Sequence, residues 1–270
     1  MTKSIALYSP KGGVGKTSLA VNLAAVSALR DGQRTLLWDL DAQGSASFLC
    51  AAEEEGPAAT AIFSRQLSPL QLTMPSAYPK LDILRADRSL RSVDHLLLEA
   101  AKPKRLRKIL KSLKSHYDRI ILDCPPGLTE LSDQIFRAVD LILVPVTPTP
   151  LGERALSQLQ SSLQELSGKA PQLMPVLSMV DMRKSLHRST VAAHPDWPVI
   201  PQSSLVEQMA LKQAPLQIFS SRSRVAASFG GLLDKVDRLI TTASKDVHRG
   251  RPRIPRPFGR DKFPLVSKQS

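Results

Sequence analysis

Short runs of apolar residues recur along the chain, and most of the segments between them carry apolar residues at helical spacing. A short apolar run bounded by polar or turn residues predicts a buried strand. The runs that we interpret as strands are residues 4–8, 35–38, 81–84, 119–122, 140–146, 173–179 and 199–201. The segments that we interpret as helices are residues 18–25, 92–101, 102–114, 152–166, a segment around 207–209 and a last helix ending near 242. This order predicts an α/β fold, a doubly wound and mostly parallel sheet with helices on both faces.

Two segments depart from this regular pattern. In residues 51–80, Pro69, Pro75 and Pro79 break any long helix, so we expect one short helix near 60–65 and loops. In residues 102–114, apolar residues recur every three or four positions, which predicts an amphipathic helix with a basic outer face. That face has two interpretations, the solvated side of a peripheral helix or an accessory anion-binding surface. Its basic residues are Lys102, Lys104, Arg105, Arg107, Lys108, Lys111 and Lys114.

A glycine-rich turn with the sequence P-K-G-G-V-G-K-T occupies residues 10–17, between the first strand and the first helix. Glycines let the backbone curl so that several N–H groups point at one anion, and the following helix adds its own N–H groups and dipole. Lys16 can reach the β- and γ-phosphates of a nucleotide, and the Thr17 hydroxyl can ligate Mg²⁺. The predicted nucleotide-binding residues of this loop are Lys11, Gly12, Gly13, Val14, Gly15, Lys16, Thr17 and Ser18.

Two other interpretations of the glycine-rich turn fit less well. A surface turn would not need the strand and helix that flank it. A dinucleotide fingerprint would need a third glycine where Ser18 stands, and it gives Lys16 no task. The strict phosphate-loop pattern also has a glycine where this chain has Pro10, so the loop is a variant with an additional lysine, Lys11.

Carboxylates follow two of the predicted strands directly. Asp39 and Asp41 come after residues 35–38, and Asp123 comes after residues 119–122. The carboxyl ends of strands in a doubly wound sheet form its ligand-binding edge. Asp123 therefore matches the carboxylate that holds Mg²⁺ in phosphate-loop enzymes. For Asp39 and Asp41, capping of a helix N-terminus is the alternative.

The chain has 270 residues and a formal net charge of +13, which favours a polyanionic partner, either nucleic acid or an acidic membrane surface. General solubility is the alternative explanation of the charge. Only two cysteines occur, Cys50 and Cys124, without metal or disulfide spacing, so we expect a reduced, cytoplasmic setting. We expect no signal peptide and no bilayer-spanning segment. Prolines interrupt the basic residues from 245 onward, which predicts a basic, disordered tail at 245–270 after a domain at 1–244.

Over residues 3–242 the chain resembles the ParA/MinD family of deviant phosphate-loop ATPases. The resemblance rests on the loop at 10–17, on D-L-D-A-Q at 39–43 and on D-C-P-P at 123–126, in that order. Ala42 stands where the family commonly has proline. The resemblance implies a Mg²⁺-dependent ATPase in which Lys16 and Asp41 act in catalysis, Asp41 on the attacking water. It also implies that Thr17, Asp39 and Asp123 form the metal site.

The resemblance implies three further contacts. Lys11 would reach across an ATP-sandwich homodimer to the partner's phosphates. Met182, Arg183 and Pro201 would line the adenine pocket, although an asparagine that several family members carry nearby is missing. Three basic residues would bind DNA without sequence preference, and these are Arg222, Arg224 and Lys212.

The resemblance implies an ATPase on the bacterial nucleoid that segregates or positions a cargo, with a partner protein that stimulates hydrolysis and releases the DNA. A membrane-cycling ATPase of the MinD type is the alternative. The proline-broken basic tail argues against the amphipathic helix that it would need. A third class, the nitrogenase iron-protein branch, needs paired cluster cysteines that Cys50 and Cys124 do not provide.

Overall fold

The structure is a computed structural model that describes residues 3–50, 57–99, 104–166 and 170–248. Its centre is an eight-stranded sheet with the order β3-β4-β2-β5-β1-β6-β7-β8. Every neighbouring pair is parallel except β3 and β4. The strands are β1 (Lys3–Leu7), β2 (Thr35–Asp39), β3 (Thr73–Pro75), β4 (Leu81–Leu84), β5 (Arg119–Asp123), β6 (Leu141–Val146), β7 (Gln172–Val180) and β8 (Val199–Pro201).

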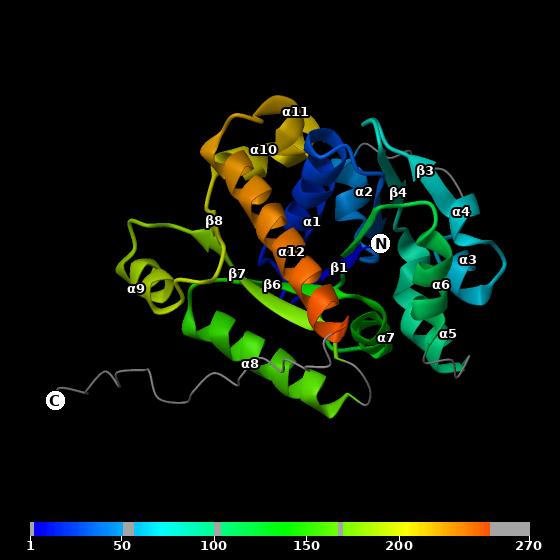
Figure 1. The fold of residues 1–270 in the computed structure, drawn as a ribbon. Helices are drawn as coiled ribbons and strands as arrows, with labels where there is room; N and C mark the ends of the chain where they lie inside the picture. Colours follow the sequence, from blue (N-terminus) through cyan, green and yellow to red (C-terminus); the bar gives the residue numbers. More distant parts are fainter. Residues whose placement is uncertain (1–2, 51–56, 100–103, 167–169, 249–270) are drawn as a thin grey trace.

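Helices cover both faces of this sheet (Figure 1). One layer contains α1 (Lys16–Ala25), α2 (Ser45–Leu49), α10 (Ser204–Lys212), α11 (Leu216–Phe219) and α12 (Arg224–His248). The other contains α3 (Ala61–Ser64), α4 (Pro69–Leu72), α5 (Val93–Glu99), α6 (Arg105–Leu113), α7 (Glu130–Ala138) and α8 (Pro150–Glu165). A further helix, α9 (Ser185–Ala193), connects β7 to β8.

Alternate residues of the central strands divide between two hydrophobic cores. In β5, Ile120 and Leu122 pack into the core under α6 to α8, whereas Ile121 packs into the core under α1 and α12. This division follows from the period of two residues in a strand. The arrangement confirms the predicted doubly wound, mostly parallel α/β fold, and it places the carboxyl ends of β1, β2 and β5 side by side.

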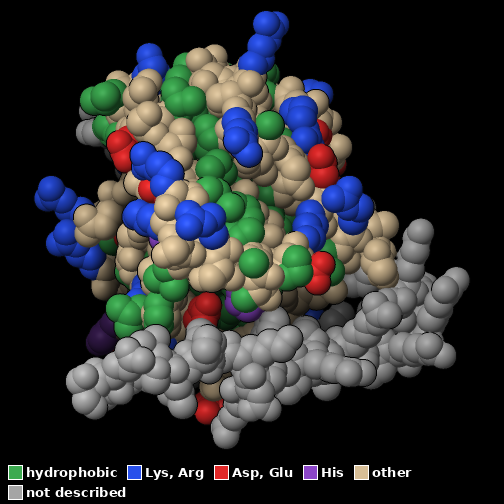
Figure 2. Space-filling view, turned by 90° about the vertical axis from the view of Figure 1, so that its left-hand side faces the viewer, with side chains coloured by type: hydrophobic (Ala, Val, Ile, Leu, Met, Phe, Trp, Pro, Cys, Tyr) green, Lys and Arg blue, Asp and Glu red, His purple; other side chains and the backbone are tan. Residues whose placement is uncertain are grey.

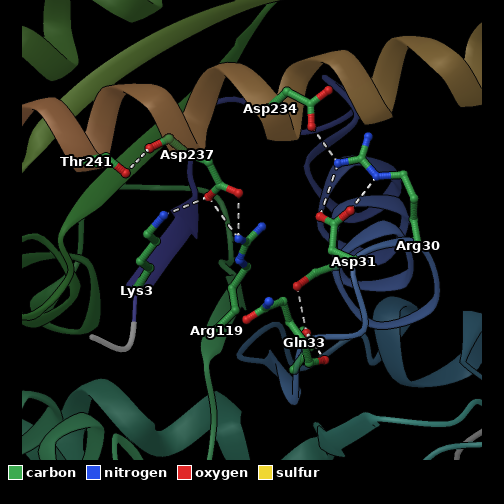
Figure 3. Close-up of polar contacts among 10 residues, drawn as sticks. Lys3, Arg30, Asp31, Gln33, Arg119, Asp234, Asp237 and Thr241 are labelled. Atoms are coloured by element: carbon green, nitrogen blue, oxygen red, sulfur yellow. Dashed lines mark hydrogen bonds and ion pairs between the residues drawn. The ribbon is translucent and has the colours of Figure 1, made fainter.

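Ion pairs attach α12 to the opposite, amino-terminal edge of the sheet (Figure 3). Arg119, at the start of β5, donates to both carboxylate oxygens of Asp237 at 2.8 and 2.9 Å. Lys3 of β1 donates to the same carboxylate at 3.0 Å. Arg30 donates to Asp234 at 2.6 Å. Helix α12 therefore depends on charges from three separate segments for its position.

A short π-helical turn, Val26–Arg30, ends the helix that begins with α1 and carries Arg30 toward α12. A Cβ atom on Gly230 would lie 2.8 Å from the Arg30 guanidinium, so a glycine in α12 makes room for it. The helix that follows the glycine-rich loop and the long C-terminal helix are thus packed directly against each other.

Several elements differ from those predicted. The region of residues 51–80 contains α4 and β3 in addition to the expected short helix, and α2, α7, α9 and α11 were not predicted. The last helix does not end near 242 but continues to His248, through the predicted domain boundary at 244. The predicted tail beyond His248 lies outside the described residues.

Candidate nucleotide site

The glycine-rich loop lies between the carboxyl end of β1 and the first turn of α1. Gly13 and Gly15 have φ angles of 71° and 91°, in the left-handed region that favours glycine. A Cβ atom on Gly15 would also lie 3.0 Å from the Ser178 hydroxyl of β7. Both glycines are therefore required by the backbone path, and they leave the first N–H groups of α1 facing the loop.

Lys16, the first residue of α1, folds its side chain back into this loop. It is only 7% exposed, and its ammonium donates to the backbone carbonyl of Lys11 at 3.1 Å. Burial lowers the pKa of Lys16, and the charges of Asp123 and Asp41 oppose that shift. The buried ammonium thus lies near the carboxylates of the sheet edge, and Lys11 itself is half-buried at the loop.

Asp123 ends β5 and is paired in register with Asp39 at the end of β2. Among the described residues, neither carboxylate oxygen of Asp123 has a hydrogen-bond partner, although both are buried. Burial raises its pKa first and the charge of Asp39 second. The Thr17 hydroxyl, which lies close to the carboxylate but outside hydrogen-bonding geometry, and the charge of Lys16 favour the ionised form. A buried, unpartnered carboxylate is costly and is typical of a group that binds a cation.

The residues present fit magnesium as such a cation. The described ranges contain no cluster of three or more His, Cys, Asp or Glu side chains that could hold a metal by themselves. Mg²⁺ does not need one, because it is usually held by one or two protein oxygens, by waters and by substrate phosphates. Asp123 and the Thr17 hydroxyl supply such oxygens beside the phosphate-binding loop.

The two other predicted carboxylates are placed differently. Asp39 accepts hydrogen bonds from the backbone N–H of Asp41 at 3.1 Å and from the N–H and hydroxyl of Ser47 at 2.9 and 2.8 Å. Burial raises its pKa to about 6, and these hydrogen bonds oppose the shift. Ser47 lies in the first turn of α2, so Asp39 accepts from one of the free N–H groups of that turn, although the N-cap residue itself is Gly44 and not an aspartate. Asp41 is half-buried and accepts from the Gln43 N–H at 3.0 Å.

Tyr8 connects the phosphate loop to the segment after Asp123, and our sequence analysis did not select it. Its hydroxyl donates to the Gly127 carbonyl at 2.7 Å, and its ring meets Phe136 of α7 edge-on at 4.8 Å. Gly127 has a φ of 91°, and Thr129 caps α7. The position of Tyr8 at the end of an apolar strand could have indicated this contact, because a buried phenol needs a hydrogen-bond partner.

The predicted adenine loop follows β7. Arg183 is exposed and forms an ion pair with Asp181 at 2.9 Å. Two residues of α9 hold the loop, and neither was predicted. The Nδ1 atom of His187 accepts from the Asp181 N–H at 2.9 Å, and Arg188 donates to the carbonyls of Met182 and Arg183. Pro201 of β8 is paired with Val180 of β7, so it lies beside the start of this loop.

The predicted DNA-binding residues are all exposed. Lys212 ends α10, Arg222 lies in the turn before α12, and Arg224 is the first residue of α12. The Lys212 ammonium lies 5.4 Å above the Phe219 ring. Figure 2 shows the side of the molecule that carries α9, where Lys and Arg side chains surround a strip of hydrophobic ones and acidic side chains are few. None of the helices in the described ranges has the length and apolar character needed to span a bilayer.

The fold and the loop define a P-loop nucleotide hydrolase of the α/β type. A family profile described as "AAA domain" matches residues 2–175. The chromosome partitioning protein ParA of Myxococcus xanthus (strain DK1622) is 33% identical over 195 residues, which are 69% of this chain and 68% of that protein. The chain belongs to the ParA/MinD family of ATPases, as the motifs predicted.

Solved structures share the fold at low identity. An ATP complex of a McdA variant from Cyanothece has a TM-score of 0.76 at 20% identity and covers 87% of this chain and 96% of its own. The septum site-determining protein MinD from Pyrococcus horikoshii, solved with Mg-ADP, has a TM-score of 0.72 at 21% identity and covers 88% and 97%. These similarities support the fold of the described chain.

Proposed function

We propose that the protein is a Mg²⁺-dependent ATPase that forms an ATP-bridged homodimer, binds DNA without sequence preference and positions or segregates a cargo. The observation that carries the enzymatic part is the buried, unpartnered carboxylate of Asp123 beside Thr17 and Lys16. Phosphoryl transfer depends mainly on positioning and on neutralising charge, and these three residues supply both at one sheet edge.

Within one subunit the residues divide the work. Lys16 would exchange the Lys11 carbonyl for phosphate oxygens, because its ammonium already lies inside the loop. Thr17 and Asp123 would hold Mg²⁺, which neutralises phosphate charge when bound. Asp41 would orient the attacking water, as the family resemblance implies. Asp39 would support this edge indirectly, because both of its oxygens already accept hydrogen bonds from Asp41 and Ser47.

Lys11 supplies the charge that one subunit lacks. Its side chain is half-buried, and its position at the head of the loop agrees with a role toward a second nucleotide. We infer that it reaches the phosphates bound by the partner subunit, which makes hydrolysis depend on dimerisation. Met182, Arg183 and Pro201 would contact the adenine, with α9 holding the loop through His187.

The DNA-binding part rests on charge. Two subunits joined by ATP would present Arg222, Arg224 and Lys212 twice, which raises affinity for phosphates by avidity. Hydrolysis stimulated by a partner protein would separate the subunits and release the DNA. This cycle places the protein in the cytoplasm on the nucleoid, and the cargo can be a plasmid, a chromosome or a protein complex.

Sedimentation velocity with the Asp41→Ala variant tests the dimer most directly. If Asp41 acts in hydrolysis, this variant retains ATP, so we expect a dimer with ATP and Mg²⁺ and a monomer with ADP. A monomer in both states, with ATP bound, would contradict the proposed cycle. Wild-type protein in the same buffers is the control.

A further inference from the structure

Helix α6 (Arg105–Leu113) and the residue before it carry four exposed cations, Lys104, Arg107, Lys108 and Lys111. Arg107 and Lys108 are adjacent, and each lies three or four positions from both Lys104 and Lys111, so the four cations lie on one side of the helix. The apolar residues of the helix are all buried in the core beneath it, and these are Leu106, Ile109, Leu110 and Leu113. This group of four cations, which we call the α6 basic face, points away from the core.

Within the described ranges, no acidic side chain compensates these charges. In the part of the chain that the structure describes, none of the four forms an ion pair, and the first turn of α6 has no acidic residue. Like charges three or four positions apart destabilise a helix, and cations at its N-terminus oppose the helix dipole. The α6 basic face therefore costs stability.

Neighbouring basic residues have structural tasks and so provide a contrast. Arg105 donates to the carbonyls of Ile62 and Phe63 at the end of α3. Lys114 forms an ion pair with Asp140 at 3.6 Å. The contacts of Arg105 and Lys114 explain why a cation stands at each position. The four cations of the α6 basic face have no comparable contact with any residue that the structure describes.

The α6 basic face is separate from the predicted DNA-binding residues. Helix α6 packs in the layer with α7, whereas α12, which begins at Arg224, covers the other face of the sheet (Figure 1). A contact made through α6 would therefore be additional to one made through Arg222 and Arg224.

We propose that the α6 basic face is a second binding surface for the phosphate backbone of double-stranded DNA. This proposal deepens the proposed function, because it adds a site for the same partner.

The exposed residues within α6 are Arg107, Lys108, Lys111 and Ser112, with no apolar side chain among them. A protein interface would need an apolar centre, and lysine is depleted from such interfaces. A membrane would take up an apolar helix face, but that of α6 is buried in the core. Binding to the phosphates of DNA, in contrast, requires cationic side chains and no apolar surface.

The test is binding of the full chain to a random-sequence DNA duplex across a salt series, with ATP and with ADP. The variant is K108Q/K111Q, because glutamine keeps the helix propensity while it removes the charge. The matched control is R34Q/K80Q, whose charges already have partners in Asp118 and the Gly32 carbonyl. Each lost phosphate contact lowers the salt slope by about 0.9, so we expect the slope to fall by about 2 in K108Q/K111Q.

We expect an unchanged slope in R34Q/K80Q and a melting temperature of K108Q/K111Q equal to or above that of wild type. A wild-type slope in K108Q/K111Q would overturn the second surface and leave the proposed function intact. A lowered slope in K108Q/K111Q together with equal wild-type binding in ATP and ADP would support the second surface and contradict the ATP-dependent cycle. If K108Q/K111Q lost binding to anionic phosphatidylglycerol vesicles while its DNA binding stayed unchanged, the proposed second DNA surface would be wrong. The α6 basic face would then be a membrane-binding surface.

Discussion

The ammonium of Lys16 donates a hydrogen bond to the backbone carbonyl of Lys11 across 3.1 Å. This bond ties the head of the phosphate loop to the first residue of α1 from the inside. The two lysines differ in exposure: the Lys16 side chain is buried in the loop, whereas Lys11 is more accessible. The two lysines therefore have different tasks, which mutation can distinguish.

Lys11→Ala should leave ATP binding by the monomer nearly unchanged and lower the partner- or DNA-stimulated hydrolysis rate by about 1,000-fold, the effect expected when a cation supplied to the transition state is removed. Fluorescent-nucleotide titration and steady-state hydrolysis measure the two quantities. Lys16→Ala is the control and should lose nucleotide affinity itself. Dimerisation and stimulated hydrolysis at the wild-type level in Lys11→Ala would refute the cross-subunit role.

Asp123→Asn should stabilise the nucleotide-free protein while it damages the site. The substitution removes a buried charge without a hydrogen-bond partner among the described residues, so we expect the free energy of unfolding to rise by about 1 kcal/mol. Mg²⁺ affinity in the presence of ATP should fall at least about 10-fold. Denaturant unfolding and Mg²⁺ titration check both effects. A destabilised variant with normal Mg²⁺ affinity would show that Asp123 is a structural residue.

Asp237→Asn should destabilise the fold far more than Lys3→Met. Arg119 is 4% exposed, and Asp237 is its ion-pair partner, so removing the carboxylate leaves a buried guanidinium and costs about 3 kcal/mol. Lys3 is more accessible and should contribute less than about 1 kcal/mol. Chemical denaturation of the two variants compares them. Equal losses would mean that Arg119 finds another partner.

The hydrogen bond between the Asp181 N–H and His187 should make the predicted adenine loop sensitive to pH. Burial lowers the pKa of His187 from its ordinary value of 6.5, the charge of Lys184 acts in the same direction, and Asp181 opposes both. The folded state therefore favours the neutral ring, whose Nδ1 can accept from the backbone. Stability from this source is present above pH 6.5 and decreases as the pH falls through the lowered pKa.

Melting temperatures at pH 7.5 and pH 5.5 test that dependence. Wild type should lose more stability between the two pH values than His187→Gln, which has no ring to protonate. Nucleotide affinity should also fall more in wild type than in His187→Gln between these pH values, because His187 holds the loop that follows β7. An identical pH dependence in both proteins would show that His187 is only a packing residue.

The sequence predicted the parts of the fold that repeat a simple physical pattern. Strands buried on both faces form apolar runs, so β1, β5 and β6 were found within one or two residues. Helix α9 has no such pattern, because only His187 and Thr190 are buried along it. Helices as short as α2 and α11 show no full period of apolar residues, and their position depends on the core that they cover.

The site was predictable to the extent that its chemistry needs adjacent residues. The glycine loop, Lys16, Thr17 and Asp123 are recognised from short motifs. The state of Asp39 could not be predicted, because it depends on Ser47, eight positions later, and on the turn between them. Tyr8 and Gly127 meet across 119 positions of sequence, and only the folded sheet brings them together.

ATP should control the binding of this protein to DNA, and one measurement tests this control most directly. Binding of the wild-type chain to a random-sequence duplex should be measured with ATP, with ADP and without nucleotide, at several salt concentrations. We predict tight binding only with ATP, without sequence preference and falling steeply with salt. Binding of equal strength in all three states would contradict the account, since the basic charge would then act independently of the nucleotide site.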